Sequence, residues 1–432
     1  MAEVACDDLP MSNNILHIST YDYGGAGIAA YRLHRNLKAH GFNSKMLVLD
    51  SKTTEPEVIA VSGAHALGQA IRVVSKVMLK LFSDQDYYFQ DQRLSVCQAN
   101  EELYQRLEMK PDVIVMHWVS GFMSIEQIAA IARHYKAKLL IYMMDMANLT
   151  GGCHYAWDCT GYTKQCGQCP ALKLSGSNDL SARIMRHKVK ALEGIDVEVV
   201  AAASWGERQA KASSLFQHKI VNKLLLPVNP EIFKPLEQAE QIKLKQQLGL
   251  PEDKKLLMFG SQGFSIKRKG LSLLMQAFER LSADPEVDNE QVCLVLAGQP
   301  PEGLSLPFAS KTLGFLKGDE ALAQAYQVAD VFICASIEDS GPMMINESVM
   351  CGTPVIAFEM GVAPDLVTEG ETGFLSKLAD VEELALKLKR FLQLRQSELE
   401  QMSALCRNEA LALCDPKLQV QWFSQLMQKE SR

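Results

Sequence analysis

The sequence predicts an α/β protein of two domains, each built on a parallel β-sheet. At 432 residues the chain is longer than one hydrophobic core usually supports, so we expect two domains of roughly 200 residues each. Short, continuously apolar runs such as 331–335 and 355–358 recur along the chain, separated by polar loops and helical patterns. Such runs are typical of parallel strands that are covered on both faces.

The composition excludes several classes of protein. With 47% hydrophobic and 22% charged residues the chain resembles an ordinary globular protein, and its formal net charge of −7 argues against a broad nucleic-acid role. No apolar run reaches the roughly 18 to 20 residues of a membrane span, and residues 1–10 lack the apolar core of a secretory signal. We therefore expect a cytoplasmic protein with no nucleic-acid partner.

The first strand leads into a glycine-rich loop. Residues 1–13 are expected to be disordered, 15–18 to form a strand, and the loop 19–27 to open a helix. In this loop Gly24 and Gly25 let a backbone approach phosphates closely, and a helix start adds a favourable dipole. A glycine turn without a ligand is the alternative.

The same glycines also fit a dinucleotide-binding fingerprint. Gly25, Gly27 and Ala30 match G-x-G-x-x-A, and Asp50 stands about where a ribose-binding acid is found. That fingerprint needs its first glycine in a tight turn directly after the strand, whereas several residues are expected to intervene here. It is the weaker interpretation.

Residues 64–82 combine apolar and basic side chains at helical spacing. Arg72, Lys76 and Lys80 are four residues apart, so they share one helix face. The segment fits a packed helix with a solvated basic edge. Alternatively, it is a peripheral contact with anionic lipid at the inner face of a membrane.

Two further strands of the first domain end in polar residues. Residues 113–118 end in His117 and Trp118, and residues 138–142 lead into Met144 and Asp145. Because ligands bind at the carboxyl ends of parallel strands, both ends should face a cleft. Histidines at strand ends are as often structural, so both roles stay open for His117.

Four of the eleven cysteines fall within seventeen residues and end in a C-x-x-C pair: Cys153, Cys159, Cys166 and Cys169. Such a set could chelate a structural Zn²⁺ and order a loop with little core of its own. A disulfide-capable cluster and independent thiols are the alternatives. A catalytic metal is disfavoured because four thiolates leave no open position.

The proline-rich segment 224–235 is expected to cross between the domains, and the strand 255–260 opens the second domain. Lys267, Arg268 and Lys269 then stand at a helix start, where they oppose the helix dipole unless an anion binds there. A solvated basic turn is the alternative.

The stretch 331–358 is predicted as strand, acidic loop, helix and strand. Ser340 is a plausible N-cap, so the helix should begin just after Asp339, and Gly352 stands where a left-handed residue ends a helix. The helical neighbours of Glu347 are all apolar, so its carboxylate needs a partner.

Two interpretations of these carboxylates compete. In the first, Glu347 reaches water or a distant cation. In the second, Asp339 and Glu347 face a cleft in which the free N–H groups of the helix start meet a diphosphate and Glu347 accepts hydrogen bonds from sugar hydroxyls. A nucleotide-sugar has both features.

This stretch resembles the signature of glycosyltransferase family 4, whose members are retaining enzymes of the GT-B fold. Asp339, seven residues and Glu347 precede Met-Cys-Gly-Thr-Pro-Val at 350–355, and the motifs at 361–367 and 370–375 continue the pattern. Asp339 replaces the commoner Glu. The resemblance implies two Rossmann-like domains whose parallel sheets face each other across a cleft.

The resemblance also implies roles for individual residues. Arg268 and Lys269 would hold the donor diphosphate, Glu347 the ribose and Asp339 the sugar. Gly24 and Gly25 would meet the phosphate from the other domain, and Met344 and Ile345 would complete the donor site. No cofactor would be required for catalysis.

The segment Thr-Gly-Gly-Cys-His-Tyr at 150–155 resembles a subgroup of the family in exopolysaccharide and colanic acid synthesis. In that subgroup a His-Asp pair ends the preceding strand. Here Met144 stands at the His position, and a thioether cannot donate a proton or a hydrogen bond. His117 is the candidate that compensates for the loss.

The sequence therefore predicts a retaining hexosyltransferase that moves a sugar from a UDP or GDP sugar to a glycan or lipid-linked acceptor in surface polysaccharide synthesis. A non-catalytic subunit that binds a sugar nucleotide and a GT-B sugar-nucleotide epimerase are the alternatives. The expected parts of the chain are a disordered 1–13, an acceptor domain 14–226 with a cysteine-rich loop 150–170, a donor domain 227–409, and a C-terminal helix at 410–432 that crosses back to the first domain.

Overall fold

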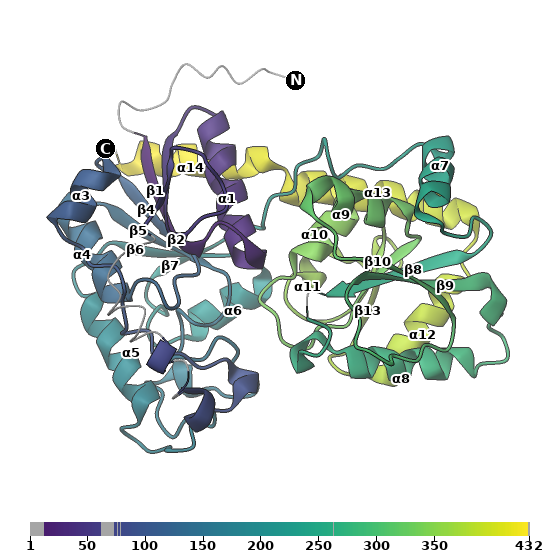
Figure 1. Ribbon diagram of the computed structural model, residues 1–432, viewed down its shortest axis with the longest axis horizontal. Coiled ribbons are helices and arrows are strands. Elements are labelled where there is room, and N and C mark those ends of the chain that lie inside the picture. Colours follow the sequence, from purple (N-terminus) through teal and green to yellow (C-terminus); the bar gives the residue numbers. More distant parts are fainter. Residues whose placement is uncertain (1–12, 62–72, 76, 78, 262, 431–432) are drawn as a thin grey trace. The chain divides into compact units, whose positions relative to one another are not determined.

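The computed structural model describes residues 13–61, 73–75, 77, 79–261 and 263–430 (Figure 1). The chain forms two compact units, and its last helix belongs to the first of them. The first unit comprises Met1–Ala202, Gly206–Leu224 and Pro416–Arg432, and the second comprises Ala203–Trp205 and Leu225–Asp415.

The first unit is built on a seven-stranded parallel sheet of order β3-β2-β1-β4-β5-β6-β7. Its strands are buried almost throughout, as the continuous apolar runs predict. Its elements are β1 (Asn14–Tyr21), α1 (Gly24–Ala39), β2 (Asn43–Asp50), β3 (Val58–Ala60), η2 (Gln85–Tyr87), α3 (Glu101–Leu107), β4 (Val113–Met116), α4 (Ile125–Tyr135), β5 (Lys138–Met143), η3 (Gly161–Thr163), α5 (Leu180–Ala191), β6 (Val197–Ala201), α6 (Ser204–Ala212), β7 (Ile220–Lys223) and α14 (Pro416–Glu430).

The second unit contains a six-stranded parallel sheet of order β10-β9-β8-β11-β12-β13. Its elements are α7 (Gln238–Leu248), β8 (Lys255–Ser261), η4 (Lys267–Lys269), α8 (Leu271–Ser282), η5 (Asn289–Gln291), β9 (Val292–Gly298), β10 (Ala309–Gly314), α9 (Gly318–Val328), β11 (Val331–Cys334), α10 (Met343–Met350), β12 (Val355–Phe358), α11 (Ala363–Leu366), β13 (Gly373–Ser376), α12 (Val381–Leu392) and α13 (Gln396–Cys414). Helices α8 and α12 pack side by side on one face of this sheet, and α9, α10 and α13 cover the other (Figure 1).

Each sheet has one point at which the strand order reverses. In the first unit it lies between β1 and β4, and in the second between β8 and β11. The strands that flank such a point send their connections to opposite faces of the sheet, which opens a crevice at their carboxyl ends. The predicted site residues follow β1, β4 and β5 in the first unit and β8 and β11 in the second.

The structure corrects two predicted boundaries. Strand β1 runs on to Tyr21 and α1 begins at Gly24, so the expected loop 19–27 shrinks to two residues. Helix α10 begins at Met343 with Pro342 as its N-cap and no side-chain capping bond, so Ser340 is not the cap. Gly352 has the predicted positive φ, at 74°.

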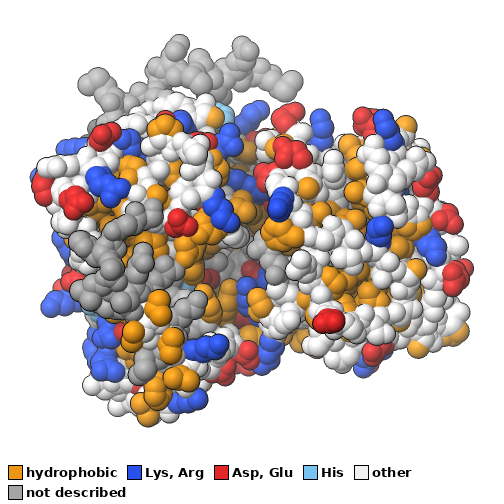
Figure 2. Space-filling view, in the orientation of Figure 1, with side chains coloured by type: hydrophobic (Ala, Val, Ile, Leu, Met, Phe, Trp, Pro, Cys, Tyr) orange, Lys and Arg blue, Asp and Glu red, His pale blue; other side chains and the backbone are white. Residues whose placement is uncertain are grey.

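Most of the segment 64–82, predicted as a packed helix or alternatively as a membrane contact, lies outside the described residues, as do residues 1–12. The described positions 73–75, 77 and 79–82 are helical, and Val73, Val74 and Leu81 expose more than half of their surface. Hydrophobic side chains also gather on the visible face of the first unit (Figure 2). No helix among the described residues is long and apolar enough to cross a membrane.

Three histidines meet in the interior of the first unit. His17 on β1 and His117 after β4 share a hydrogen bond of 3.0 Å between Nδ1 and Nε2, and His34 on α1 packs edge-on against His17. Burial lowers the pKa of His34 to about 4 and that of His117 to about 3. All three rings are therefore neutral at physiological pH.

These histidines should make the first unit sensitive to acid. The unfolded chain binds protons at these residues below about pH 6.5, whereas the folded rings resist protonation until about pH 4. The free energy of unfolding should therefore fall over that window, by up to about 1.4 kcal/mol per pH unit for each histidine. Denaturant unfolding at several pH values measures this slope. We expect a shallower slope for His34→Gln and an unchanged one for the exposed His218→Gln, and equal slopes in all three proteins would contradict the assignment.

Candidate functional sites

The basic turn of the second unit is held in place by its backbone. Lys267, Arg268 and Lys269 form the single turn η4, and the Ile337 N–H donates to the Arg268 carbonyl at 2.8 Å. Gly270 follows at a φ of +68°, where an added Cβ would lie 1.9 Å from the Ala335 carbonyl oxygen. Only glycine lets this turn pack so closely on the end of β11.

Asp339 joins the two predicted diphosphate-binding residues. Its Oδ2 accepts hydrogen bonds from Arg268 Nη1 at 2.9 Å and from Lys269 Nζ at 2.6 Å. Burial opposes ionisation, but the charges of Lys269 and Arg268 outweigh it and hold the pKa of Asp339 below its usual range. One carboxylate thus orients two cations, and the cluster keeps a net positive charge.

The start of α10 lies beside this cluster. Its N-cap makes no side-chain hydrogen bond, and the buried Ser340 hydroxyl has no hydrogen-bond partner among the residues that the structure describes. A buried hydroxyl without a partner is unfavourable, so a ligand that accepts its hydrogen bond would be stabilised here. Both carboxylate oxygens of Asp339 already accept hydrogen bonds, Oδ2 from the two cations and Oδ1 from the Gly341 N–H at 3.3 Å. The contact of Asp339 with a sugar stays a prediction.

Glu347 is buried on α10, and its Oε2 accepts a hydrogen bond from the Tyr326 hydroxyl at 3.2 Å. The interpretation in which it reaches water is therefore wrong. Burial and the nearby Glu347 carboxylate both raise the pKa of Tyr326, so its hydroxyl stays protonated and donates. Tyr326 comes from α9, in the segment Tyr-Gln-Val-Ala-Asp at 326–330, and its pairing with Glu347 was not predicted.

The remaining predicted donor residues lie in different surroundings. Met344 lines a small hollow at the ends of β8 and β11, together with Lys269 and Ser336. Ile345 is fully buried in the core, and its N–H already bonds the Pro342 carbonyl at 3.0 Å. The prediction that Ile345 contacts a ligand is therefore not supported by its position.

Gly24 and Gly25 form the uncapped start of α1 in the first unit. Gly24 has a φ of +72°, and a Cβ at either position would meet no atom within 4 Å. The fold gives Gly25 no steric reason to lack a side chain. Open space beside free N–H groups suits the close approach of an anion.

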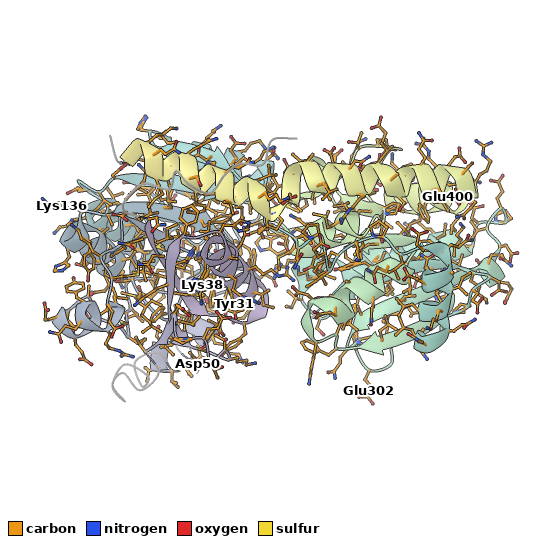
Figure 3. All side chains as sticks on the ribbon, turned by 90° about the horizontal axis from the view of Figure 1, so that it is seen from above. Tyr31, Lys38, Asp50, Lys136, Glu302 and Glu400 are labelled. Carbon is orange, nitrogen blue, oxygen red and sulfur yellow. The ribbon has the colours of Figure 1, made fainter. Side chains whose placement is uncertain are left out.

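The short turn between β1 and α1 favours the dinucleotide interpretation, but the acid that would bind the ribose already has a hydrogen-bond partner. Asp50 at the end of β2 accepts a hydrogen bond from the Tyr23 hydroxyl at 2.9 Å. Tyr31 and Lys38 lie on α1 (Figure 3). The Tyr31 hydroxyl donates to Glu55, and Lys38 pairs with Glu57, both in the loop before β3. The acids after β2 therefore serve to fasten α1.

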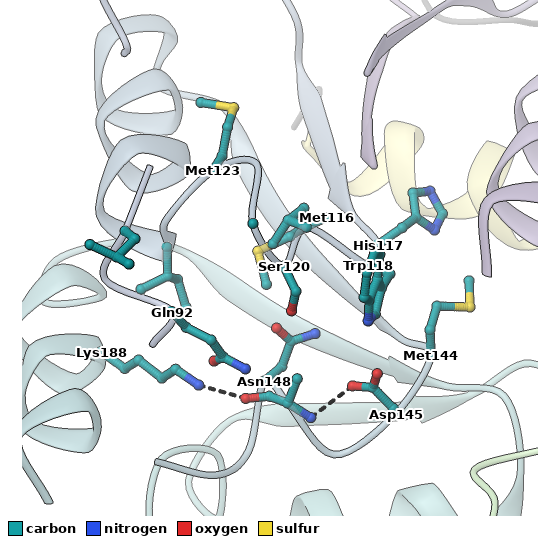
Figure 4. A pocket seen from close by; sticks show the side chains of 15 residues that line it. Gln92, Met116, His117, Trp118, Ser120, Met123, Met144, Asp145, Asn148 and Lys188 are labelled. Carbon is teal, nitrogen blue, oxygen red and sulfur yellow. Dashed lines mark hydrogen bonds between the residues drawn. The ribbon is translucent and has the colours of Figure 1, made fainter. Parts of the chain in front are cut away.

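A second hollow lies at the ends of β4 and β5, and Figure 4 shows the side chains that line it. Met144 and Asp145 both border this hollow, as predicted from the ends of the strands. The His117 side chain turns away from Asp145 (Figure 4), and its ring bonds His17 in the interior. His117 also borders this hollow, but it is 1% exposed, and burial lowers its pKa to about 3. Its role as the group that replaces the missing histidine stays a prediction.

The histidine that does meet Asp145 is His154, which belongs to the motif Thr-Gly-Gly-Cys-His-Tyr at 150–155. Its Nδ1 lies 2.6 Å from Asp145 Oδ2, and its Nε2 lies 3.0 Å from the Ser120 hydroxyl. Lys188 is fully buried behind Asp145 and donates to the carbonyls of Ala147 at 2.5 Å and Thr150 at 2.7 Å. Burial lowers the pKa of Lys188 to about 7.

The four clustered cysteines have free thiols within one loop. The N–H groups of Gly151 and Gly161 donate to Cys166 Sγ at 3.2 Å and to Cys159 Sγ at 3.5 Å, and a hydrogen bond from Cys153 lowers the pKa of Cys169 to about 7. The chemistry of this donor set fits zinc. Among the described residues, however, no three side chains of His, Cys, Asp or Glu are arranged to hold a metal ion.

The chain also contains an Asp-x-Asp sequence, at Asp84 and Asp86. Asp84 Oδ1 accepts the Asp86 N–H at 2.9 Å and caps η2. The pair thus has a local structural role as an N-terminal cap.

The fold is that of the GT-B class, with two Rossmann-like units on parallel sheets. The sucrose-phosphate synthase of Thermosynechococcus elongatus superposes with a TM-score of 0.65 at 17% identity, covering 96% of this chain and 98% of that one. Anabaena HepE, solved with UDP and glucose, gives a TM-score of 0.63 at 16% identity over 96% and 99% of the two chains. At these identities the likeness shows the fold alone.

Residues 240–408, within the second unit, match the family model of the glycosyl transferases group 1. The sulfoquinovosyl transferase SQD2 of Arabidopsis thaliana is 30% identical over 210 residues, which are 47% of this chain and 39% of that protein. The N-acetyl-alpha-D-glucosaminyl L-malate synthase of Bacillus anthracis is 24% identical over 215 residues, covering 44% and 55%. The chain thus aligns with about half or less of these curated relatives.

Proposed function

We propose that the chain is a retaining glycosyltransferase that moves a sugar from a nucleoside diphosphate sugar to a glycan or lipid-linked acceptor in surface polysaccharide synthesis. The observation that carries this proposal is the cluster of Arg268, Lys269 and Asp339 at the uncapped start of α10. The match of residues 240–408 to the glycosyl transferases group 1 supports it.

The cluster has the features that departure of a diphosphate requires. Arg268 and Lys269 are oriented before any ligand arrives, so they stabilise the charge that develops on the leaving phosphate without reorganising. A diphosphate would compete with Asp339 for both cations and accept from Ser340. Asp339 would then be released toward the sugar, and Glu347, already fixed by Tyr326, would bind the ribose.

Incubation with candidate donors separates this function from its rivals. A thermal-shift screen of UDP and GDP sugars identifies the donor, since a ligand at 100 times its Kd stabilises the folded state by about 2.7 kcal/mol. A transferase then releases nucleoside diphosphate and forms a product whose anomeric configuration, read by NMR, matches that of the donor. An epimerised donor would support the epimerase instead. Binding without turnover would support the non-catalytic subunit.

We also propose that Cys153, Cys159, Cys166 and Cys169 bind one structural zinc ion, on the basis of their spacing and their gathering in one loop. Purified protein should then carry about one equivalent of zinc by mass spectrometry, since thiolate sites of this kind are closed and structural. Cys166→Ser should lose the metal, and Cys97→Ser, elsewhere in the same unit, should keep it. Metal-free protein with all four thiols titratable and the loop folded would refute the proposal.

A further inference from the structure

Two carboxamide side chains line the hollow of the first unit without completing their hydrogen bonds. Asn148 is 8% exposed, and no described residue donates to its amide or accepts from it. The Nε2 of Gln92 is buried and is likewise unpaired within the described part of the chain. Figure 4 shows both amides and the Ser120 hydroxyl directed toward the same space. They come from three segments, which lie before α3, after β4 and after β5.

These amides have no evident structural role in the free protein. A buried amide without a partner is unfavourable, because it has lost its hydrogen bonds to water and gained none in return. Apolar side chains of similar size would fill the same space without that cost. A bound ligand that completes the hydrogen bonds of Gln92 and Asn148 gives a reason for both to be polar.

The charges around the hollow favour an uncharged ligand. Its charged side chains are Lys188, which donates to the Ala147 and Thr150 carbonyls, and Asp145, which lies 2.6 Å from His154 Nδ1. A phosphate would therefore meet no available cation here and would face a carboxylate. A carboxamide donates through nitrogen and accepts through oxygen, and a hydroxyl group does both, so neighbouring hydroxyls suit this pair of amides.

An aromatic surface adjoins the polar groups. Trp118 borders the hollow, and its indole Nε1 donates to His154 Nδ1 at 3.1 Å, which fixes the ring. The ring centroid of Tyr21 lies 6.3 Å from that of Trp118, and Tyr21 stacks on Tyr23 at 4.7 Å. Apolar walls with a few oriented polar groups are typical of small-molecule sites. A sugar ring offers both apolar C–H faces and an edge of hydroxyl groups.

We propose that this hollow binds a neutral sugar unit of the acceptor, with Gln92 and Asn148 as the residues that recognise its hydroxyl groups. Trp118 packs against the ring of that sugar, and Ser120, whose hydroxyl lies 3.0 Å from His154 Nε2, keeps a lone pair to accept a further hydrogen bond. This inference rests on the proposed function and narrows it. The acceptor is a glycan recognised by its sugar hydroxyls, and its phosphate or lipid is not what this hollow reads.

Saturation-transfer NMR on the full chain tests the site without any nucleotide. The probes are the methyl glycosides of glucose, galactose, mannose, N-acetylglucosamine and fucose, in both anomers. At least one of them should bind saturably, and inorganic phosphate should not displace it. Absence of saturable binding across the whole set, or displacement by phosphate, would overturn the inference.

Two variants of nearly unchanged size separate a ligand contact from a structural role. Gln92→Met and Asn148→Leu should each weaken glycoside binding by about 5- to 10-fold, the effect of one lost hydrogen bond. Their Tm should stay the same or rise, since the free protein loses no hydrogen bond. Gln98→Met, an exposed position in the same unit, should change neither quantity. Unchanged glycoside affinity in both variants, or a Tm lowered by several degrees in both, would contradict the site.

Kinetics and nucleotide binding distinguish failure of the site from failure of the proposed function. Gln92→Met should raise the KM for the glycoside acceptor at an unchanged kcat and leave the Kd for UDP or GDP within threefold. A protein that binds nucleotide but none of the glycosides would overturn the sugar site and leave the proposed function standing. Glycoside binding by a protein that binds no nucleotide would overturn the proposed function and, with it, the acceptor role of the hollow.

Discussion

The double variant Arg268→Ala, Lys269→Ala is expected to weaken binding of UDP or GDP by about 100- to 10,000-fold. Each charge-assisted hydrogen bond contributes roughly 1.5 to 3 kcal/mol, and each 1.4 kcal/mol is a factor of ten in Kd. The double substitution also removes both ion-pair partners of Asp339, so its carboxylate would stand unpaired beside the phosphates. Either single variant should lose less, because the remaining cation still neutralises Asp339.

Isothermal titration calorimetry of both nucleotides measures this effect. Lys267→Ala is the matched control, because Lys267 stands in the same turn with an exposed side chain. The affinity of this variant for UDP or GDP should change by less than threefold. Equal affinities in the double variant and the wild type would show that the basic turn is not the diphosphate site.

Gly270→Ala is expected to cause a large loss of stability in the second unit. A Cβ there would lie 1.9 Å from the Ala335 carbonyl oxygen, and the residue also has a φ of +68°. Strain and overpacking of this kind cost about 3 to 5 kcal/mol, which corresponds to a Tm lower by roughly 10 °C for a unit of this size. The displaced turn would also carry Arg268 and Lys269 away from Asp339, so nucleotide affinity should fall as well.

Gly303→Ala isolates the steric part of that effect. Gly303 has a similar φ of +76°, but a Cβ there would meet nothing within 4 Å. This variant should therefore lose only about 1 kcal/mol, the cost of a left-handed non-glycine residue. Similar Tm values for the two variants would show that the close packing of Gly270 on β11 does not matter.

Much of the second unit could be predicted from sequence because its signals are local. Continuous apolar runs mark the parallel strands, and the three cations before Gly270 are adjacent in the chain. Their pairing with Asp339 was not predictable, since about 70 residues separate the partners and only the strand order β8-β11 brings them together. The buried bond between Tyr326 and Glu347 joins residues 21 positions apart, and it depends on how α9 and α10 pack together.

The first unit was predicted less well. His117 looked functional because it ends a strand, but the side chain after β4 points toward His17 in the interior, and no local pattern distinguishes the two directions. His154 lies in a loop without periodicity, and its contacts with Asp145 and Ser120 depend on how that loop folds back over β4 and β5. The motif Thr-Gly-Gly-Cys-His-Tyr at 150–155 is the one local signal for His154.

The central claim is that the second unit binds a nucleoside diphosphate through Arg268 and Lys269. Titration of UDP and GDP into the wild-type protein tests it most directly. We expect saturable binding of at least one nucleotide, and Lys269→Ala should weaken it by about 10-fold or more. Absence of binding for both nucleotides, or binding that Lys269→Ala leaves unchanged, would contradict it.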